Sequence, residues 1–287
     1  MNKAIFVTGA TGNVGKETVK QLIKQGEHVI AATRAIEPID NTNNLEYRYF
    51  SFYDASSWET ALAGTERIFL MRPPHISNIK RDMLPFLTHL KERQIKQIVF
   101  LSVQGAENNP IVPHHVIENY LYKLELPFTI VRPSFFMQNL TTTHLNEIKD
   151  ENRLFIPAGK GRTNFIDVRD IGKFCARMFI DREHLGKAYT ITGEQSYSYQ
   201  EVAELLSNTL GKAIEYVNPN PIRFLRYHLS KGRSFGMSTV MLALYTIVRL
   251  GKGDITTDSF SKIMGYIPCS LSQFLLDHTA ILGNNNP

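Results

Sequence analysis

The glycine-rich stretch FVTGATGNVGKETV, residues 6–19, most constrains what this chain can fold into. Gly9, Gly12 and Gly15 recur every three residues, after the apolar run AIFVT and before a helical spacing of apolar residues over 13–25. A glycine turn between a strand and a helix exposes backbone N–H groups and the positive end of a helix dipole, both of which attract phosphate. A second strand-like run, HVIAATR, follows, so the stretch predicts the pyrophosphate turn of a dinucleotide-binding fold.

Two nearby features narrow the choice of nucleotide. A nucleoside-triphosphatase loop requires Gly-Lys followed by Ser or Thr, whereas Lys16 is followed here by Glu17, which offers no hydroxyl to magnesium. An NAD-selective site usually has Asp or Glu after the second strand, and this chain has Arg34 there. A guanidinium matches a ribose 2′-phosphate in charge and in its forked donors. The sequence therefore predicts NADP(H), with NADPH preferred over NADH.

Apolar runs alternate with helical patterns through the first half of the chain, and RIFLM, QIVFLS and FTIVRP read as further strands. This alternation predicts an α/β fold with a Rossmann-type doubly wound parallel sheet. The pattern loosens after Pro133, and the chain reads as mostly helical from Pro221. We expect residues 1–150 to form the NAD(P)-binding Rossmann domain, with part of the later chain returning to it. Residues 151–287 are expected to form a smaller, mostly helical C-terminal substrate lobe.

Composition excludes few classes of protein. The net charge is +5, but Lys and Arg are scattered, which suits an anionic ligand as readily as nucleic acid. Cys175 and Cys269 have no metal or redox spacing, so no metal site is predicted and Cys175 reads as a core residue. The N-terminus lacks a signal-peptide pattern and the run 238–248 is too short to span a bilayer, which favours a cytoplasmic protein. In the basic stretch 223–233, a solvated helix face is favoured over a nucleic-acid or membrane-surface role.

With TGATGNVG, Arg34, YDASSW and FTIVRPSFFMQN in view, the chain resembles the NmrA-like group of atypical short-chain dehydrogenases/reductases. The similarity extends through IDVRDIG and AYTITG to the C-terminal helices. The resemblance implies a dinucleotide-binding fold that carries a small C-terminal substrate lobe. Members of this group include quinone and triphenylmethane-dye reductases, nitrogen-control redox sensors and proteins labelled sugar-nucleotide epimerases.

The resemblance implies roles for individual residues. Contacts to the pyrophosphate are implied for Thr8, Gly9, Thr11, Gly12, Asn13, Val14 and Gly15. Arg34 would bind the 2′-phosphate and Asp54 the adenine edge. The residues implied near the nicotinamide half are Leu70, Met71, Arg72, Ser102, Val103 and Gln104. The residues implied to line the substrate site are Phe135, Phe136, Met137 and Asn139, although an aromatic cluster alone is as typical of a core.

The catalytic pattern departs from the group. Classical members use Tyr-x-x-x-Lys, whose lysine lowers the tyrosine pKa, but the matching positions here are Pro110 and His114. Tyr120 and Lys123 have the wrong spacing. His114 is the one catalytic candidate, because an imidazole can hold the nicotinamide ribose or donate a proton near neutral pH. Glu118, one helical turn on, could orient it; the alternative is a helix-start histidine with a surface glutamate.

These observations favour an NADPH-dependent oxidoreductase that passes hydride to a planar, electron-poor acceptor such as a quinone, without a Tyr-Lys pair. The alternatives are a non-catalytic NADP(H) redox sensor that regulates a protein partner and, less favoured, a nucleoside-diphosphate-sugar epimerase. We expect a small-molecule substrate or none, and neither direct nucleic-acid binding nor a membrane partner. The sequence leaves open a homodimer and a regulatory protein partner.

Overall fold

The computed structural model describes residues 3–35, 42 and 44–283, which form two compact units. The first unit comprises residues 1–133 and 168–191, and the second comprises residues 134–167 and 192–287. Within the described residues, no helix is long and apolar enough to cross a membrane.

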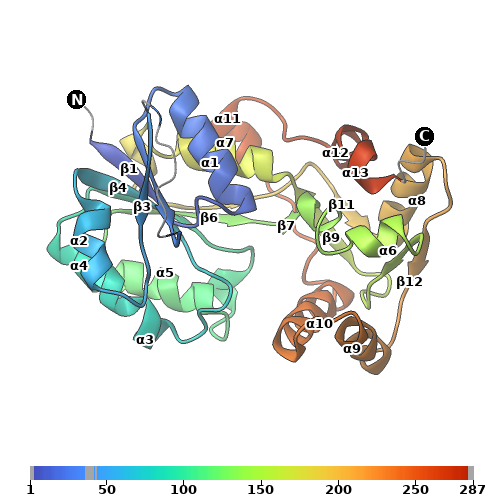
Figure 1. Ribbon diagram of the computed structural model, residues 1–287. Coiled ribbons are helices and arrows are strands. Elements are labelled where there is room, and N and C mark those ends of the chain that lie inside the picture. Colours follow the sequence, from blue (N-terminus) through green and yellow to red (C-terminus); the bar gives the residue numbers. More distant parts are fainter. Residues whose placement is uncertain (1–2, 36–41, 43, 284–287) are drawn as a thin grey trace. The chain divides into compact units, whose positions relative to one another are not determined.

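A seven-stranded parallel sheet forms the centre of the first unit (Figure 1). Its strands are β1 (Ala4–Val7), β2 (Val29–Thr33), β3 (Leu45–Tyr49), β4 (Thr65–Met71), β5 (Gln97–Leu101), β6 (Phe128–Pro133) and β10 (Ala188–Ile191). Their spatial order is β10-β6-β5-β4-β1-β2-β3, so the chain reverses direction across the sheet between β1 and β4. In open α/β sheets, ligands bind beyond the carboxyl ends of the strands at this point. The predicted Rossmann-type fold is confirmed.

Helices cover both faces of this sheet (Figure 1). One face carries α1 (Asn13–Lys24) and α7 (Val168–Arg177), and the other carries α2 (Ser56–Leu62), α4 (Leu84–Glu92) and α5 (Pro113–Lys123). The short segments α3 (Ile79–Asp82), η1 (Ala106–Asn108) and η3 (Arg182–His184) complete the unit. A buried aromatic cluster lies under α2 and α4, where Phe50 meets Phe86 with ring centroids 5.0 Å apart. Cys175 is fully buried in α7, as the sequence predicted.

The second unit mixes small sheets with helices. Strands β7 (Phe135–Phe136), β9 (Arg162–Ile166) and β11 (Ser196–Ser198) form one sheet, and β8 (Arg153–Phe155) and β12 (Glu215–Val217) form another. Its helical segments are η2 (Met137–Asn139), α6 (Leu145–Lys149), α8 (Tyr199–Leu210), α9 (Pro221–Ser230), α10 (Phe235–Arg249), α11 (Ser259–Met264), α12 (Leu271–Asp277) and α13 (Thr279–Leu282). Ser198 and Gly211 cap the two ends of α8.

The boundary between the units differs from the predicted one at residue 150. The first unit ends at Pro133, the last residue of β6, and Ser134 begins the second unit because β7 pairs with β9. Residues 168–191 return to the first unit, since α7 packs closely on α1 and β10 pairs with β6. The approach of the two helices requires Gly172, where a Cβ would lie 2.7 Å from the Cβ of Glu17.

Candidate functional site

The glycine turn lies at the carboxyl end of β1 and folds tightly back on itself. Gly9 has φ +63°, in the left-handed region that favours glycine, and the Gly12 N–H donates to the Gly9 carbonyl at 2.9 Å. A Cβ on Gly15 would lie 2.0 Å from the same carbonyl oxygen. Gly15 therefore lets the first turn of α1 sit directly on the loop, which is how the structure brings the helix end to the strand end.

The N-terminus of α1 is suited to an anion. Gly12 is its N-cap and has no side chain to accept from the first N–H groups, and no acidic residue lies in the first turn. Among the described residues, no side chain caps this helix end. The free N–H groups and the helix dipole together favour phosphate at this position. The turn and helix therefore fit the pyrophosphate that the sequence predicted there.

Thr8 and Met71 join the glycine turn to the neighbouring strand. The Thr8 hydroxyl accepts from the Met71 N–H at 2.7 Å and lies 3.2 Å from the Phe69 carbonyl, to which it donates. Its side chain is thus engaged between β1 and β4, so a cofactor contact from Thr8 would come from its backbone. The Met71 methyl lies over Gly9, where a Cβ would be 2.1 Å away. The structure therefore brings these two predicted positions together.

Arg34 and Asp54 were both assigned to the adenosine half of the cofactor. Arg34 follows β2 and is exposed, and no described residue forms a hydrogen bond or ion pair with its guanidinium. Asp54 lies just before α2, and its Oδ1 accepts from the backbone N–H of Ser56 at 3.1 Å and from the Ser56 hydroxyl at 2.6 Å. Arg34 is therefore available to an anionic ligand, whereas one oxygen of Asp54 holds a helix start.

A buried carboxylate lies at the edge formed by β5 and β6. Glu118 on α5 accepts from the Ser102 hydroxyl at 2.5 Å and binds Arg132 through both oxygens, at 3.0 and 2.7 Å. Glu118 is only 3% exposed, and Arg132 also lies 3.3 Å from Glu107. The expectation that Glu118 orients His114 is wrong, because both of its oxygens are engaged by Arg132 and Ser102. Ser102 is itself fixed by this pair, directly after β5.

His114 is held in an apolar setting at the start of α5. Its ring centroid lies 6.2 Å from that of Phe100, and its Nδ1 has no hydrogen-bond partner among the described residues. Burial, with a smaller contribution from the Arg72 charge, lowers the pKa of His114 to about 3. The imidazole is therefore neutral at physiological pH, which opposes the expected proton donation by a charged ring. A catalytic role for the neutral imidazole stays a prediction.

Arg72 shapes the loop that follows β4. Its Nη1 donates to three backbone carbonyls, those of Pro73 at 2.9 Å, Pro74 at 3.1 Å and Ile76 at 2.6 Å. Burial lowers the pKa of the guanidinium, although an arginine remains charged at any physiological pH. Its side chain thus braces the loop at the edge where the nicotinamide half is expected. Leu70, Val103 and Gln104 lie at this same carboxyl edge, at the ends of β4 and β5.

The four residues predicted to line the substrate site lie in the second unit. Met137 is 1% exposed and Phe135 packs on Phe165 and Tyr245, with ring centroids 6.4 and 6.5 Å apart. Met137 therefore belongs to the core of this unit, whereas Phe135 is half-buried against that core and stays a prediction as a substrate contact. Phe136 and Asn139 are partly exposed, and they stay predictions as substrate contacts.

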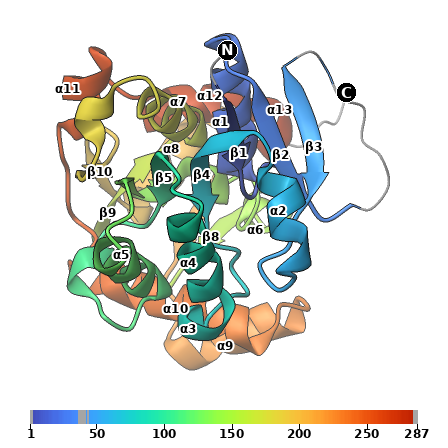
Figure 2. The same cartoon turned by 90° about the vertical axis from the view of Figure 1, so that its left-hand side faces the viewer.

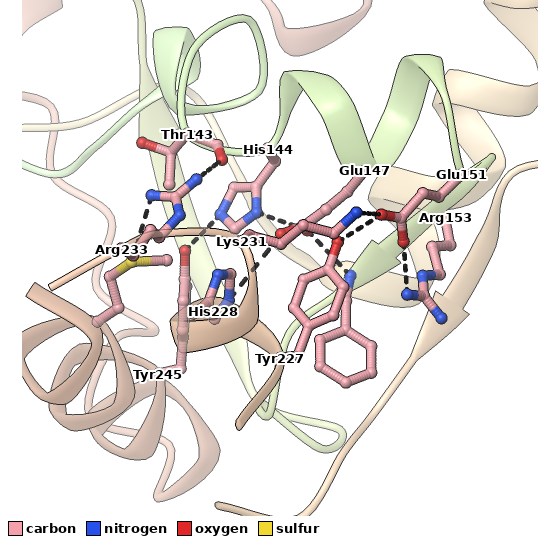
Figure 3. A network of polar contacts seen from close by, with 12 residues as sticks. Thr143, His144, Glu147, Glu151, Arg153, Tyr227, His228, Lys231, Arg233 and Tyr245 are labelled. Carbon is pink, nitrogen blue, oxygen red and sulfur yellow. Dashed lines mark hydrogen bonds and ion pairs between the residues drawn. The ribbon is translucent and has the colours of Figure 1, made fainter. Parts of the chain in front are cut away.

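A buried polar network in the second unit was not predicted (Figure 3). His144 contacts Glu147 at 2.9 Å through Nδ1 and the Tyr245 hydroxyl at 2.6 Å through Nε2. His228 lies 3.9 Å from the other oxygen of Glu147. Burial raises the pKa of Glu147, but His144 and His228 outweigh it and hold that pKa below its usual range. The His-x-x-Glu spacing of 144 and 147 is the one sequence signal that points to this network.

Comparison with known proteins assigns the chain to a family. A model of the NmrA-like family matches residues 1–250. The chain belongs to the NmrA-like family. It is 30% identical over 277 residues to prestalk A differentiation protein A of Dictyostelium discoideum, covering 94% of this chain and 91% of that protein. It is 31% identical over 281 residues to the uncharacterized oxidoreductase YesF of Bacillus subtilis, covering 96% and 95%. The resemblance seen in the motifs is confirmed.

Solved structures share the fold over 94–98% of this chain. The NADPH-dependent quinone oxidoreductase QOR2 of Escherichia coli, complexed with NADPH, has a TM-score of 0.84 at 20% identity and covers 94% of this chain and 98% of its own. The triphenylmethane reductase of Citrobacter sp., complexed with NADP(H), has a TM-score of 0.83 at 20% identity, covering 96% and 99%. NmrA, a negative transcriptional regulator in complex with NADP, has a TM-score of 0.75 at 17% identity, covering 98% and 96%. The predicted NADP(H) cofactor agrees with what these neighbours bind.

Proposed function

We propose that this NmrA-like protein is an NADPH-dependent oxidoreductase that passes hydride to a planar, electron-poor acceptor such as a quinone. The observation that carries the proposal is the pairing of an uncapped α1 N-terminus with an exposed Arg34 on the next strand end. The first favours a pyrophosphate and the second a 2′-phosphate. The oxidoreductases among the relatives and neighbours support the same class of reaction.

The site requires little chemistry from the protein. When bound, NADPH supplies the hydride, and a quinone that accepts it becomes a conjugated anion that water can protonate. The protein therefore needs to bind, orient and exclude water, which are roles for the backbone turn, Arg34 and the strand ends. A neutral His114 and the lack of a Tyr-x-x-x-Lys pair on α5 are compatible with this reaction. The same features argue against a reaction that needs a strong proton relay.

Arg34→Ala tests the cofactor assignment. We expect NADPH affinity to fall by about 10- to 100-fold, because a charge-assisted contact to the 2′-phosphate is worth roughly 1.5–3 kcal/mol. NADH affinity should stay within about two-fold, since NADH lacks that phosphate. Calorimetric titration of both cofactors measures the difference. Lys24→Ala, an exposed cation at the other end of α1, is the matched control and should bind both cofactors as wild type does. An unchanged NADPH affinity in Arg34→Ala would refute the NADP(H) assignment.

An acceptor panel tests the reaction. We expect purified protein to oxidise NADPH with quinones or with planar cationic dyes, at a rate that changes little between about pH 5.5 and 8. His114 would otherwise titrate in this range, but its pKa of about 3 keeps it neutral throughout. The rate is followed by the loss of NADPH absorbance. A histidine-like step in the pH profile would contradict the structure, and failure with every acceptor despite tight NADPH binding would refute the reductase.

A redox sensor is the second candidate function. It is favoured by the lack of a proton-relay pair and by the fold shared with NmrA, a negative transcriptional regulator in complex with NADP. A sensor must bind the oxidised and reduced cofactor with different affinities, because a ligand shifts an equilibrium only through differential binding. Equal affinities for NADP and NADPH, measured in the same titrations, would exclude it.

A further inference from the structure

A helical hairpin in the second unit concentrates the positive charge of the chain. Helices α9 and α10 pack side by side, as both views show (Figures 1 and 2). Residues 216–253, which include both helices, contain six Lys and Arg and no Asp or Glu. Because the whole chain carries +5, all other residues together carry −1. The formal charge of this segment is therefore +6, of which Lys231 is paired with Glu151 at 2.8 Å.

The hairpin also exposes apolar side chains in a regular pattern. On α10, Met237, Val240 and Leu244 are 48%, 56% and 44% exposed, and their i, i+3, i+7 spacing places them on one face. The adjoining face of α10 contributes Met241 and Tyr245 to the core of the unit. The apolar surface of α10 therefore extends from the buried face onto an exposed one. The hairpin and the residue after it expose further apolar side chains: Ile222 and Leu229 of α9, Phe235 of α10, and Leu250.

Cations flank this apolar stripe. Arg223 and Arg226 are exposed on α9 and, with Asn220 and Ile222, line a shallow cavity of about 280 Å³. Arg249, the last residue of α10, and Lys252 after it are also exposed, and the Arg249 guanidinium lies 3.4 Å from Asn218 Oδ1, just before α9. Apolar side chains edged by cations, with no carboxylate between them, are the pattern of helices that lie in the headgroup layer of a membrane.

We propose that the α9–α10 hairpin docks on the surface of an anionic phospholipid bilayer. Val240, Leu244 and their neighbours would enter the boundary between headgroups and acyl chains, and the flanking arginines would bind lipid phosphates. The helices lie on the membrane and do not cross it, since neither is long enough to span one. This docking is separate from the cofactor site, which lies in the first unit.

The charge pattern disfavours other partners for this face. A two-fold contact between two copies would bring the exposed cations Arg223, Arg226, Arg249 and Lys252 of one hairpin toward those of the other, because such a contact uses the same patch twice. The phosphates of a nucleic acid would bind the arginines, but they would offer no apolar contact to the aliphatic side chains of Val240 and Leu244. An anionic bilayer is the partner that satisfies both the charges and the apolar stripe.

Co-sedimentation of the full chain with vesicles tests the proposal. We expect binding to phosphatidylcholine vesicles that contain phosphatidylglycerol and none to phosphatidylcholine alone. The binding should weaken as salt rises from about 0.1 M to about 1 M, which shortens the Debye length from about 10 to about 3 Å. Arg223→Ser with Arg226→Ser should reduce partitioning about 25-fold, at about five-fold for each cation. Val240→Ser with Leu244→Ser should reduce it by at least about 10-fold.

A matched control separates this face from overall charge. Lys20→Ser with Lys24→Ser removes two exposed cations from one helix of the first unit and should leave vesicle binding unchanged. Equal binding to both kinds of vesicle, or an equal loss in the control, would overturn the proposal. So would concentration-dependent self-association that Val240→Ser with Leu244→Ser abolishes, which would assign the face to a second copy. Duplex DNA binding that depends on the arginines, without vesicle binding, would also overturn it.

Discussion

Gly15→Ala should abolish useful cofactor binding, with NADPH affinity falling by at least about 100-fold. The added Cβ would lie 2.0 Å from the Gly9 carbonyl oxygen and 2.7 Å from its carbon, and both are backbone atoms that no rotamer change can move aside. The turn must open, so the first N–H groups of α1 no longer point toward the position of the cofactor pyrophosphate. Overpacking of this kind costs about 3 kcal/mol of unfolding free energy, at the upper end of its usual range. Cofactor titration and urea unfolding measure the two effects.

Gly26→Ala is the matched control for this change. Gly26 follows the other end of α1, has φ +79°, and would place a Cβ in open space. The substitution should cost about 1 kcal/mol of stability from backbone strain and leave NADPH affinity unchanged. If Gly15→Ala binds NADPH as tightly as Gly26→Ala does, the turn at Gly9 is not the phosphate site. A loss of stability in Gly15→Ala without a loss of affinity would exclude that site equally.

Most of the sheet could be predicted from the sequence because strands such as β1, β4 and β5 are apolar runs bounded by a turn or helix. The position of the unit boundary could not. The pattern loosens after Pro133, but the break at Pro133 and Ser134 does not say that the next strand, Phe135–Phe136, joins a different sheet. What fixes the boundary is pairing of β7 with β9, some thirty residues later in the chain. Pairing between strands that are distant in the sequence depends on the tertiary structure, and local residue patterns do not predict it.

The candidate site also has features that the sequence predicted and features that it did not. The tight glycine turn before α1 was predictable, because a short stretch of sequence contains the whole strand-turn-helix pattern, while the phosphate contacts of the turn and of Arg34 stay predictions. The state of His114 was not, since its low pKa arises from burial and from Arg72, which is distant in the sequence. Glu118 illustrates the same limit: helical spacing suggested His114 as its partner, but the stronger donors are Arg132 and Ser102 on neighbouring strand ends. Spacing identifies neighbours on one helix only.

Glu147→Leu should destabilise the second unit by about 3 kcal/mol at neutral pH. The carboxylate accepts from His144 at 2.9 Å and from the Phe155 N–H at 3.3 Å, and all three groups are buried (Figure 3). Leucine is similar in volume but accepts no hydrogen bond, so these two donors would be left buried and unsatisfied. Each such donor costs about 1–3 kcal/mol. Urea unfolding followed by circular dichroism measures the loss.

The effect should depend on pH in a defined direction. Because the folded pKa of Glu147 lies below the ordinary carboxyl value of 4.5, its charge contributes fully above about pH 4.5. That contribution is lost as the pH falls through the lowered folded pKa, so the gap between wild type and Glu147→Leu should narrow in acid. Glu151→Leu, which removes a half-buried carboxylate paired with Lys231 and Arg153, should cost only about 1 kcal/mol. A gap that widens in acid, or equal losses in the two variants, would mean that Glu147 is not a buried anion stabilised by its histidines.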